Sequence, residues 1–209
     1  MTQAPGPTRQ QALSTPKAAG LAGVVFAVLL STAMVLARIA LPEGGGGEDL
    51  TVAQGERGAL QTATELVPFA GIAFLWFMGA LREHTGEAED RFIATVFLGS
   101  GLVFVACLFG AVAAAGTVLD AEDPTGFGRH FAYTLLTTYG MRMAAVFVLA
   151  TSTLGRKLRV LPRPLVVIGT VAGLLLLVVG SSVPYCELVF PTWALLISLY
   201  ILRIARRSA

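Results

Sequence analysis

Long apolar stretches dominate the chain and alternate with short polar segments. Three of them contain no charged side chain and reach about the 20 residues that cross the hydrocarbon core of a bilayer. These are residues 18–37, 92–119 and 164–183. Uncharged stretches of this length are typical of transmembrane helices, so the pattern predicts an integral membrane protein.

Three further stretches complete the predicted set. Residues 66–81 and 188–202 are shorter, but the segments before them, 60–65 and 184–187, can extend each helix outward. Residues 131–154 are long enough to span and contain one charge, Arg142. We therefore predict an all-α fold, a polytopic membrane helical bundle with six transmembrane helices.

The sequence predicts a single membrane domain over residues 18–204. Residues 1–17 are rich in Pro, Gln, Thr and Ala without an apolar period, which predicts a disordered tail. Residues 205–209 predict a short basic tail. The first apolar stretch is longer than the core of a signal peptide and no A-x-A site follows it, so we interpret it as a retained span.

Composition agrees with a lipid environment. Hydrophobic residues make up 55% of the chain and charged residues 13%. A soluble domain carries roughly 25% charged residues, so most of this surface faces something other than water. The net charge of +2 gives no reason to expect a nucleic-acid partner. The predicted partner is the lipid bilayer, and a membrane-protein partner or a homo-oligomer stays open.

Basic residues are distributed unevenly between the two sides of the predicted bundle. Of the 15 Lys and Arg residues, eleven flank the spans on one side, while Arg57 and Arg129 lie on the other and Arg38 and Arg142 within spans. The eleven are Arg9, Lys17, Arg82, Arg91, Arg156, Lys157, Arg159, Arg163, Arg203, Arg206 and Arg207. Cytoplasmic loops carry an excess of Lys and Arg, so both termini are predicted to face the cytoplasm (N-in and C-in).

Arg142 is the charge predicted closest to the middle of a span. It lies twelve positions after His130, which is roughly 18 Å along a helix. An Arg at the bilayer centre costs about 2.5–3.5 kcal/mol on insertion scales and usually faces the bundle interior. Because helical side chains lean toward the helix N-terminus, its guanidinium is expected to reach toward the outer leaflet.

Two carboxylates are predicted near that depth. Glu65 begins the second span and Glu187 the sixth, and both helices run in the same direction as the fourth. Polar residues spaced by four on the fourth span predict a stripe that leads from the outer surface to the Arg. The stripe consists of His130, Thr134, Thr138 and Arg142.

Two interpretations of this cluster stay open. In one, Arg142 forms a buried ion pair with Glu187 or Glu65 that orients the helices, and the Thr hydroxyls bond to their own helix. In the other, the cluster forms a hydrated, outward-facing vestibule in which Arg142 binds an anion or gates a proton path. Arg38 is interpreted as reaching the membrane interface without a function.

The sequence offers little recognisable chemistry. Cys107 and Cys186 have no metal or redox spacing, and they are interpreted as small packed residues. His84 and His130, the two histidines, both fall at loop edges, which argues against a haem held by paired mid-span histidines. No zinc-protease, nucleophile-elbow or Walker motif is present. We predict no catalytic residue, no metal and no cofactor.

The function that these features favour is a non-enzymatic structural or accessory subunit whose buried Arg–carboxylate cluster holds the bundle together. A small transporter or channel that uses the same cluster is the first alternative. A lipid-active enzyme is the second, because carboxylates alone can act as acid and base.

Several segments carry a resemblance to known sequences. They are LVPFAGIAFLWFMGALREHTGEAEDRFIATVFLGSGLVFVACLF, RMAAVFVLATST, VLPRPLVVIGTVAGLLLL and ELVFPTWALLISLYIL. Together they resemble an uncharacterised family of small six-helix integral membrane proteins, mostly from high-GC bacteria. The resemblance implies six spans and a bacterial cytoplasmic membrane, and it implies no activity, substrate or cofactor.

Overall fold

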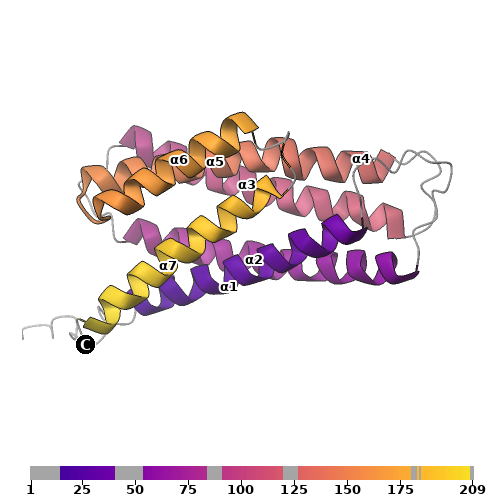
Figure 1. The fold of residues 1–209 in the computed structure, drawn as a ribbon, viewed down its shortest axis with the longest axis horizontal. Helices are drawn as coiled ribbons and strands as arrows, with labels where there is room; N and C mark the ends of the chain where they lie inside the picture. The colour runs from indigo at the N-terminus through magenta and orange to yellow at the C-terminus, as the bar shows by residue number, and fades with distance from the viewer. Residues whose placement is uncertain are drawn as a thin grey trace, which may run out of the picture.

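The computed structural model of the protein describes residues 15–40, 54–83, 91–119, 127–179, 183 and 185–207. These residues are almost entirely helical, and no strand occurs within them. The helices are α1 (Thr15–Ala40), α2 (Gln54–Glu83), α3 (Arg91–Leu119), α4 (Phe127–Thr134), η1 (Leu135–Gly140), α5 (Met141–Lys157), α6 (Arg163–Val179), η2 (Cys186–Leu188) and α7 (Val189–Arg207) (Figure 1). The predicted all-α bundle is confirmed.

The predicted tails fall largely outside the described residues. At the N-terminal side α1 already begins at Thr15, so residues 15–17 of the predicted disordered segment are helical. At the C-terminal side α7 continues to Arg207. Residues 1–14 and 208–209 lie outside the described ranges.

Five helical stretches are long and apolar enough to cross a membrane. They are Lys17–Ala40, Arg57–Arg82, Arg91–Leu119, Phe127–Lys157 and Cys186–Arg207. Helix α6 is also apolar but has only 17 residues, which is the lower limit of about 17–25 residues for a spanning helix. The structure therefore fits a membrane protein, with α6 as the shortest candidate span.

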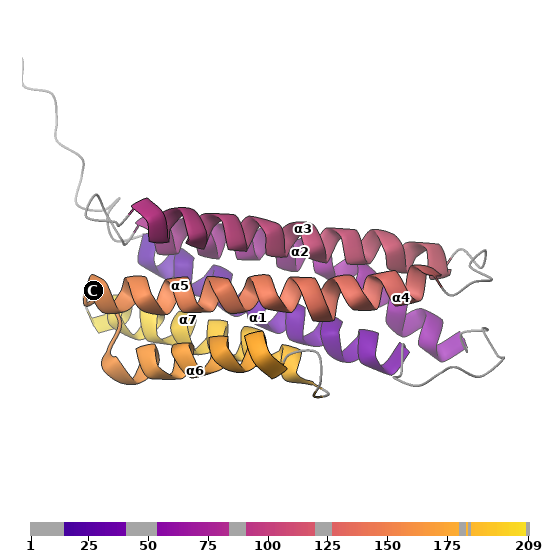
Figure 2. The same ribbon diagram turned by 90° about the horizontal axis from the view of Figure 1, so that it is seen from above.

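Helices α4 and α5 form one continuous rod. The π-helix η1 joins them, and the residues at both junctions, Thr134 and Met141, keep right-handed helical dihedral angles. Figure 2 shows α4 and α5 in line along the bundle. A π turn closes i→i+5 hydrogen bonds and fits about one more residue into the turn than an α-helix does. Residues on the two sides of η1 therefore do not follow one uninterrupted α-helical stripe.

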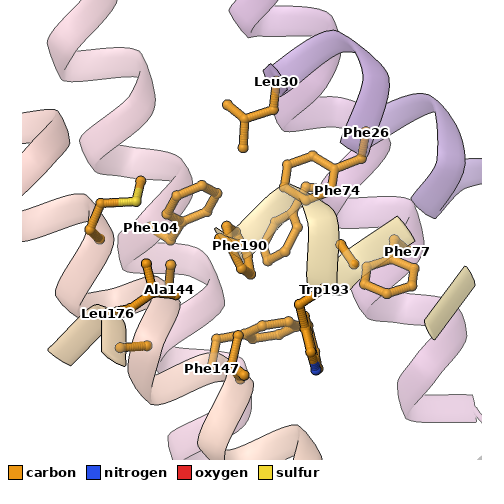
Figure 3. Close-up of a cluster of buried hydrophobic side chains, with 14 of the residues drawn as sticks. Phe26, Leu30, Phe74, Phe77, Phe104, Ala144, Phe147, Leu176, Phe190 and Trp193 are labelled. Carbon is orange, nitrogen blue, oxygen red and sulfur yellow. The ribbon is translucent and has the colours of Figure 1, made fainter. Parts of the chain in front are cut away.

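A cluster of aromatic side chains fills the centre of the bundle (Figure 3). Phe190 lies among rings from four other helices, with centroid distances of 5.6 Å to Phe26, 5.9 Å to Phe74, 4.9 Å to Phe104 and 6.2 Å to Phe147. All five rings are fully buried. In lipid, packing rather than the hydrophobic effect holds helices together. This cluster therefore anchors the start of α7, three residues after Glu187.

Helix α7 packs more extensively against α1 than against α6, its neighbour in sequence. Figure 1 shows α7 crossing over α1. The close approach depends on Gly23, because a Cβ there would collide with Ser198 Oγ and lie 2.6 Å from the Phe77 ring. The packing brings α1 beside η2, although the two elements lie far apart in the sequence.

Candidate functional site

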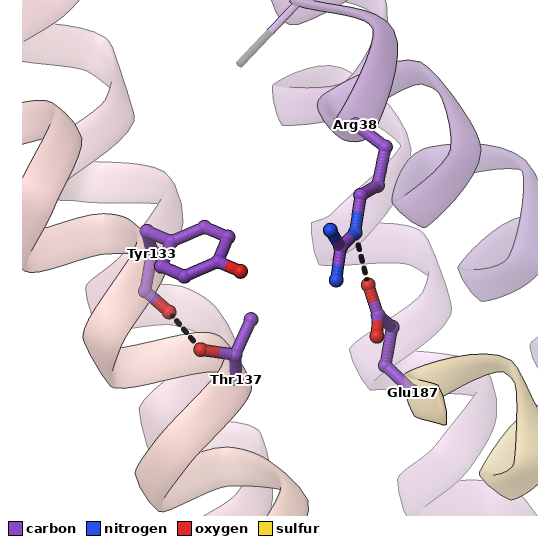
Figure 4. A network of polar contacts seen from close by, with 4 residues as sticks. All are labelled: Arg38, Tyr133, Thr137 and Glu187. Carbon is purple, nitrogen blue, oxygen red and sulfur yellow. Dashed lines mark hydrogen bonds and ion pairs between the residues drawn. The ribbon is translucent and has the colours of Figure 1, made fainter. Parts of the chain in front are cut away.

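A buried ion pair joins α1 to η2. Arg38 Nε lies 2.6 Å from Glu187 Oε1 (Figure 4). The Arg38 side chain is 12% exposed and the Glu187 side chain 4% exposed. The pair lies near the C-terminal end of α1 and just before α7. A buried pair of this kind costs desolvation energy, but removal of one partner strands the other charge away from water.

Two tyrosine rings flank the Arg38 guanidinium. Its Cζ lies 5.8 Å from the ring centroid of Tyr133 in α4 and 5.4 Å from that of Tyr185, just before η2. Both distances are within cation–π range. Tyr185 has a φ of 63°, the left-handed region that non-glycine residues rarely adopt. The turn before η2 thus accepts backbone strain while its ring covers the guanidinium.

The second carboxylate oxygen of Glu187 is left without a donor. Oε2 is buried, and it has no hydrogen-bond partner among the described residues. A buried acceptor without a donor costs free energy comparable to a lost hydrogen bond. The carboxylate therefore keeps an unused acceptor in an apolar setting.

That carboxylate lines a cavity between the α1–α2 pair and the α3–α4 side of the bundle. The cavity has a volume of about 70 Å³. Its walls are mostly aliphatic and come from α1, α2, α3, α4 and η1, with Arg38, Glu187, Thr64, Tyr133 and Thr137 as its polar side chains. Figure 4 shows Arg38 and Glu187 facing Tyr133 and Thr137 across this space.

The threonine hydroxyls of the cavity already donate to their own helices. Thr64 Oγ1 lies 2.8 Å from the Gln61 carbonyl oxygen, and Thr137 Oγ1 lies 2.8 Å from the Tyr133 carbonyl oxygen. Such bonds satisfy a hydroxyl donor without a partner helix. The dominant polar group of the cavity is therefore the Arg38–Glu187 pair.

The predicted pairing of Arg142 with Glu187 or Glu65 is wrong. Arg142 is exposed on the outside of the bundle, and its Nη1 donates to the Thr138 carbonyl of its own helix at 3.5 Å. Glu187 pairs with Arg38 instead. Glu65 is exposed on α2 and accepts a hydrogen bond from Gln61 Nε2 at 3.5 Å.

The predicted stripe likewise does not point into the bundle. His130 and Arg142 are exposed, Thr134 and Thr138 are half-buried, and the buried hydroxyl of this region is that of Thr137. The π-helix η1 lies between Thr134 and Arg142. Because a π turn rotates the residues after it relative to an α-helix, spacing by four does not predict the buried face here.

Arg38 is the cation of this site that the sequence analysis did not pair with a carboxylate. It was interpreted as reaching the membrane interface, whereas the structure half-buries it and pairs it with Glu187. A signal was available: Arg38 and Glu187 both lie near the outer ends of predicted spans, at matched depth. Nothing in the sequence, however, indicates that α1 and η2 are neighbours.

Among the described residues, the cysteines and the other possible metal ligands do not form a cluster. Cys107 and Cys186 are both buried and unbridged. Within the described ranges, no three His, Cys, Asp or Glu side chains come together as metal ligands. Searches with protein-family models, among curated proteins and among solved structures find no match to this chain.

Proposed function

We propose that the chain is a six-span protein of a bacterial cytoplasmic membrane with both termini in the cytoplasm. Five long apolar helices and the apolar 17-residue α6 support the span count. The excess of Lys and Arg on one side of the spans supports the orientation. The resemblance to small six-helix bacterial proteins supports the same arrangement.

Within that membrane we propose a non-enzymatic accessory role, in which the chain docks against a partner protein through the Arg142 face. The observation that carries this proposal is the exposure of Arg142 at the middle of the α4–α5 rod. It lies 15 residues from each end of the stretch Phe127–Lys157. That is about 22 Å from either end at 1.5 Å per residue, and half a hydrocarbon core is only about 15 Å.

An exposed Arg at this depth needs a counterpart. Its hydrogen bond to the Thr138 carbonyl is long and leaves the positive charge without a carboxylate among the described residues. The charge is costly in acyl chains, whereas an intramembrane carboxylate on a neighbouring helix neutralises it. Tyr139, which is 58% exposed on η1, adds an amphipathic ring close to it in the chain.

The counterpart is a helix of a different protein rather than a second copy of this chain. Of the 13 acidic residues, only Glu65 and Glu187 fall within or at the start of predicted spans. Glu187 is buried and paired, and Glu65, eleven residues after the start of α2, accepts a hydrogen bond from Gln61. Glu65 lies eight residues from the end of its stretch Arg57–Arg82, whereas Arg142 lies fifteen residues from either end of its own. Because the two side chains differ in depth, we propose a partner helix that carries its own mid-span Asp or Glu.

Site-specific crosslinking tests this role. A photoreactive residue at Tyr139 is expected to capture a membrane protein in native membranes, and Arg142→Leu is expected to abolish the crosslink. The matched control is the same photoreactive residue at Val171, which is 59% exposed on α6. The partner must carry a mid-span acid, and the swap of Arg142→Asp with that acid→Arg is expected to restore the crosslink. Crosslinks to lipid alone would refute docking.

The transporter alternative now rests on a different feature. The predicted vestibule along His130, Thr134 and Thr138 loses its support, because this stripe does not face the bundle interior. The cavity beside Arg38 and Glu187 is the remaining observation that favours a small-molecule role. Uptake of a labelled solute into vesicles, compared between the wild type and Glu187→Gln, tests that alternative.

A further inference from the structure

The cavity beside the Arg38–Glu187 pair has the properties of a ligand site that the docking role does not use. Its volume of about 70 Å³ is roughly five times what a single water needs. Most of its walls are aliphatic, among them Leu30, Met34, Val67 and Leu108. A mostly apolar cavity with a few polar groups is typical of sites for small organic molecules.

The hydrogen-bond acceptor of this site is the carboxylate of Glu187. Glu187 Oε1 receives the Arg38 Nε–H, while the buried Oε2 has no partner within the described part of the chain. The Thr64 and Thr137 hydroxyls donate to carbonyls of their own helices. A bound molecule with an N–H or O–H group would supply the missing hydrogen bond.

Charge decides between the candidate head groups. Arg38 already neutralises Glu187 at 2.6 Å, so an ammonium group would leave an uncompensated positive charge beside the guanidinium. A carboxylate head would face Oε2 with a like charge. Both arrangements are unfavourable in a low-dielectric site, whereas a neutral hydroxyl adds a hydrogen bond without adding charge.

We propose that this cavity binds a neutral amphipathic alcohol. The hydroxyl donates to Glu187 Oε2, and the hydrocarbon body lies against the aliphatic walls. Arg38, flanked by Tyr133 and Tyr185, holds the carboxylate in place through its Nε–H. The proposal stands apart from the docking role, because Arg142 does not line the cavity.

A series of ten-carbon compounds tests the head group. The full chain is placed in phosphatidylcholine nanodiscs, since this lipid has no hydroxyl donor, and thermal unfolding is measured with 1-decanol, decyl methyl ether, decylammonium or decanoate. At about ten times its Kd, 1-decanol is expected to raise the unfolding temperature by about 3–6 °C. The other three are expected to have little effect. An equal response to the ether, or a preference for either ion, would overturn the proposal.

A pair of variants on α3 tests the location. Ala111 lines the cavity and is buried, so Ala111→Leu is expected to fill the space and remove the response to 1-decanol. Ala113 is exposed on the same helix, so Ala113→Leu is expected to keep the wild-type response. If both variants respond as the wild type does, the alcohol binds elsewhere and the assignment is wrong.

Photolabelling of the wild-type chain keeps the test independent of variant folding. A ten-carbon alcohol with a diazirine is expected to label Met34, Val67 or Leu108, and labels confined to the outside of the bundle would contradict the proposal. Competition separates the two sources of such a hydroxyl. Loss of labelling with dioctanoylglycerol indicates a membrane lipid as the ligand, and loss with 1-decanol alone indicates a free single-chain alcohol.

Discussion

Two arginines of this bundle occupy opposite environments. Arg38 lies near the end of α1, where it is ion-paired to Glu187 and flanked by two aromatic rings. Arg142 lies at the middle of the α4–α5 rod, exposed and bonded only weakly to its own helix. The charge of Arg38 is neutralised by a carboxylate of the same chain, whereas no carboxylate among the described residues neutralises the charge of Arg142. A charge in a membrane helix is thus explained by its neighbours in space and not by its depth alone.

The largest expected effect is on the Arg38 side of this comparison. Arg38→Leu leaves Glu187 buried without a cation, and we expect it to lower the free energy of unfolding by about 3–5 kcal/mol. Reversible unfolding in mixed micelles would measure this loss. The double change Arg38→Leu with Glu187→Leu is expected to recover much of it. Strictly additive losses in the double variant would contradict a buried pair.

The next effect concerns the packing that brings the pair together. Gly23→Ala places a methyl group against Ser198 and Phe77, and we expect it to cost about 1–3 kcal/mol through overpacking. Gly99→Ala is the matched control, because no atom lies within 4 Å of a Cβ built there. Unfolding of both variants under the same conditions separates packing from helix propensity. Equal behaviour of the two would show that α1 and α7 are not closely packed at Gly23.

A smaller effect is expected from the rings over Arg38. Tyr185→Leu removes one ring but keeps a side chain at the same positive φ, so backbone strain is similar in both proteins. We expect a loss of about 0.5–1 kcal/mol. In the Arg38→Leu background the same substitution should cost less, and a double-mutant cycle measures the difference. A coupling energy of zero between the two substitutions would mean that the Tyr185 ring does not stabilise the Arg38 guanidinium.

The smallest expected effect on the isolated protein comes from Arg142. Because no carboxylate in the described structure pairs with it, Arg142→Leu is expected to change the free energy of unfolding by about 0.5 kcal/mol or less, or to raise it. Its comparison with Arg38→Leu is the sharpest contrast between the two regions. A loss as large as that of Arg38→Leu would place Arg142 in an internal ion pair and would remove the basis for docking.

The helical architecture could be predicted because it depends on local pattern. In lipid, an uncharged stretch of about 20 residues must satisfy its backbone hydrogen bonds internally, and a helix does so. The Gly23 contact and the aromatic cluster around Phe190, in contrast, depend on which helices are neighbours. Hydrophobic period and composition do not indicate which helices pack together. The short connection from α6 to α7 suggests that α6 is the main neighbour of α7, but α7 packs mainly against α1.

The candidate site was predicted in part. Glu187 was predicted as an acid at the start of the last span, and the structure buries it there and pairs it with Arg38 instead of Arg142. Whether Arg38 or Arg142 pairs with Glu187 depended on which face of the α4–α5 rod carries Arg142. The π-helix η1 changes that face, because it rotates the residues that follow it. A π turn has no reliable signature in sequence, so spacing by four assigned Arg142 to the wrong face.

The amino-acid sequence by itself determined that this chain forms apolar helices suited to a membrane, because hydrophobicity and length act within each segment. Only the tertiary structure decided that Arg38 meets Glu187, that Glu187 lines an apolar cavity, and that Arg142 faces outward. These outcomes depend on helix neighbours and helix rotation, and both are decided by side-chain packing between segments that lie far apart in the chain.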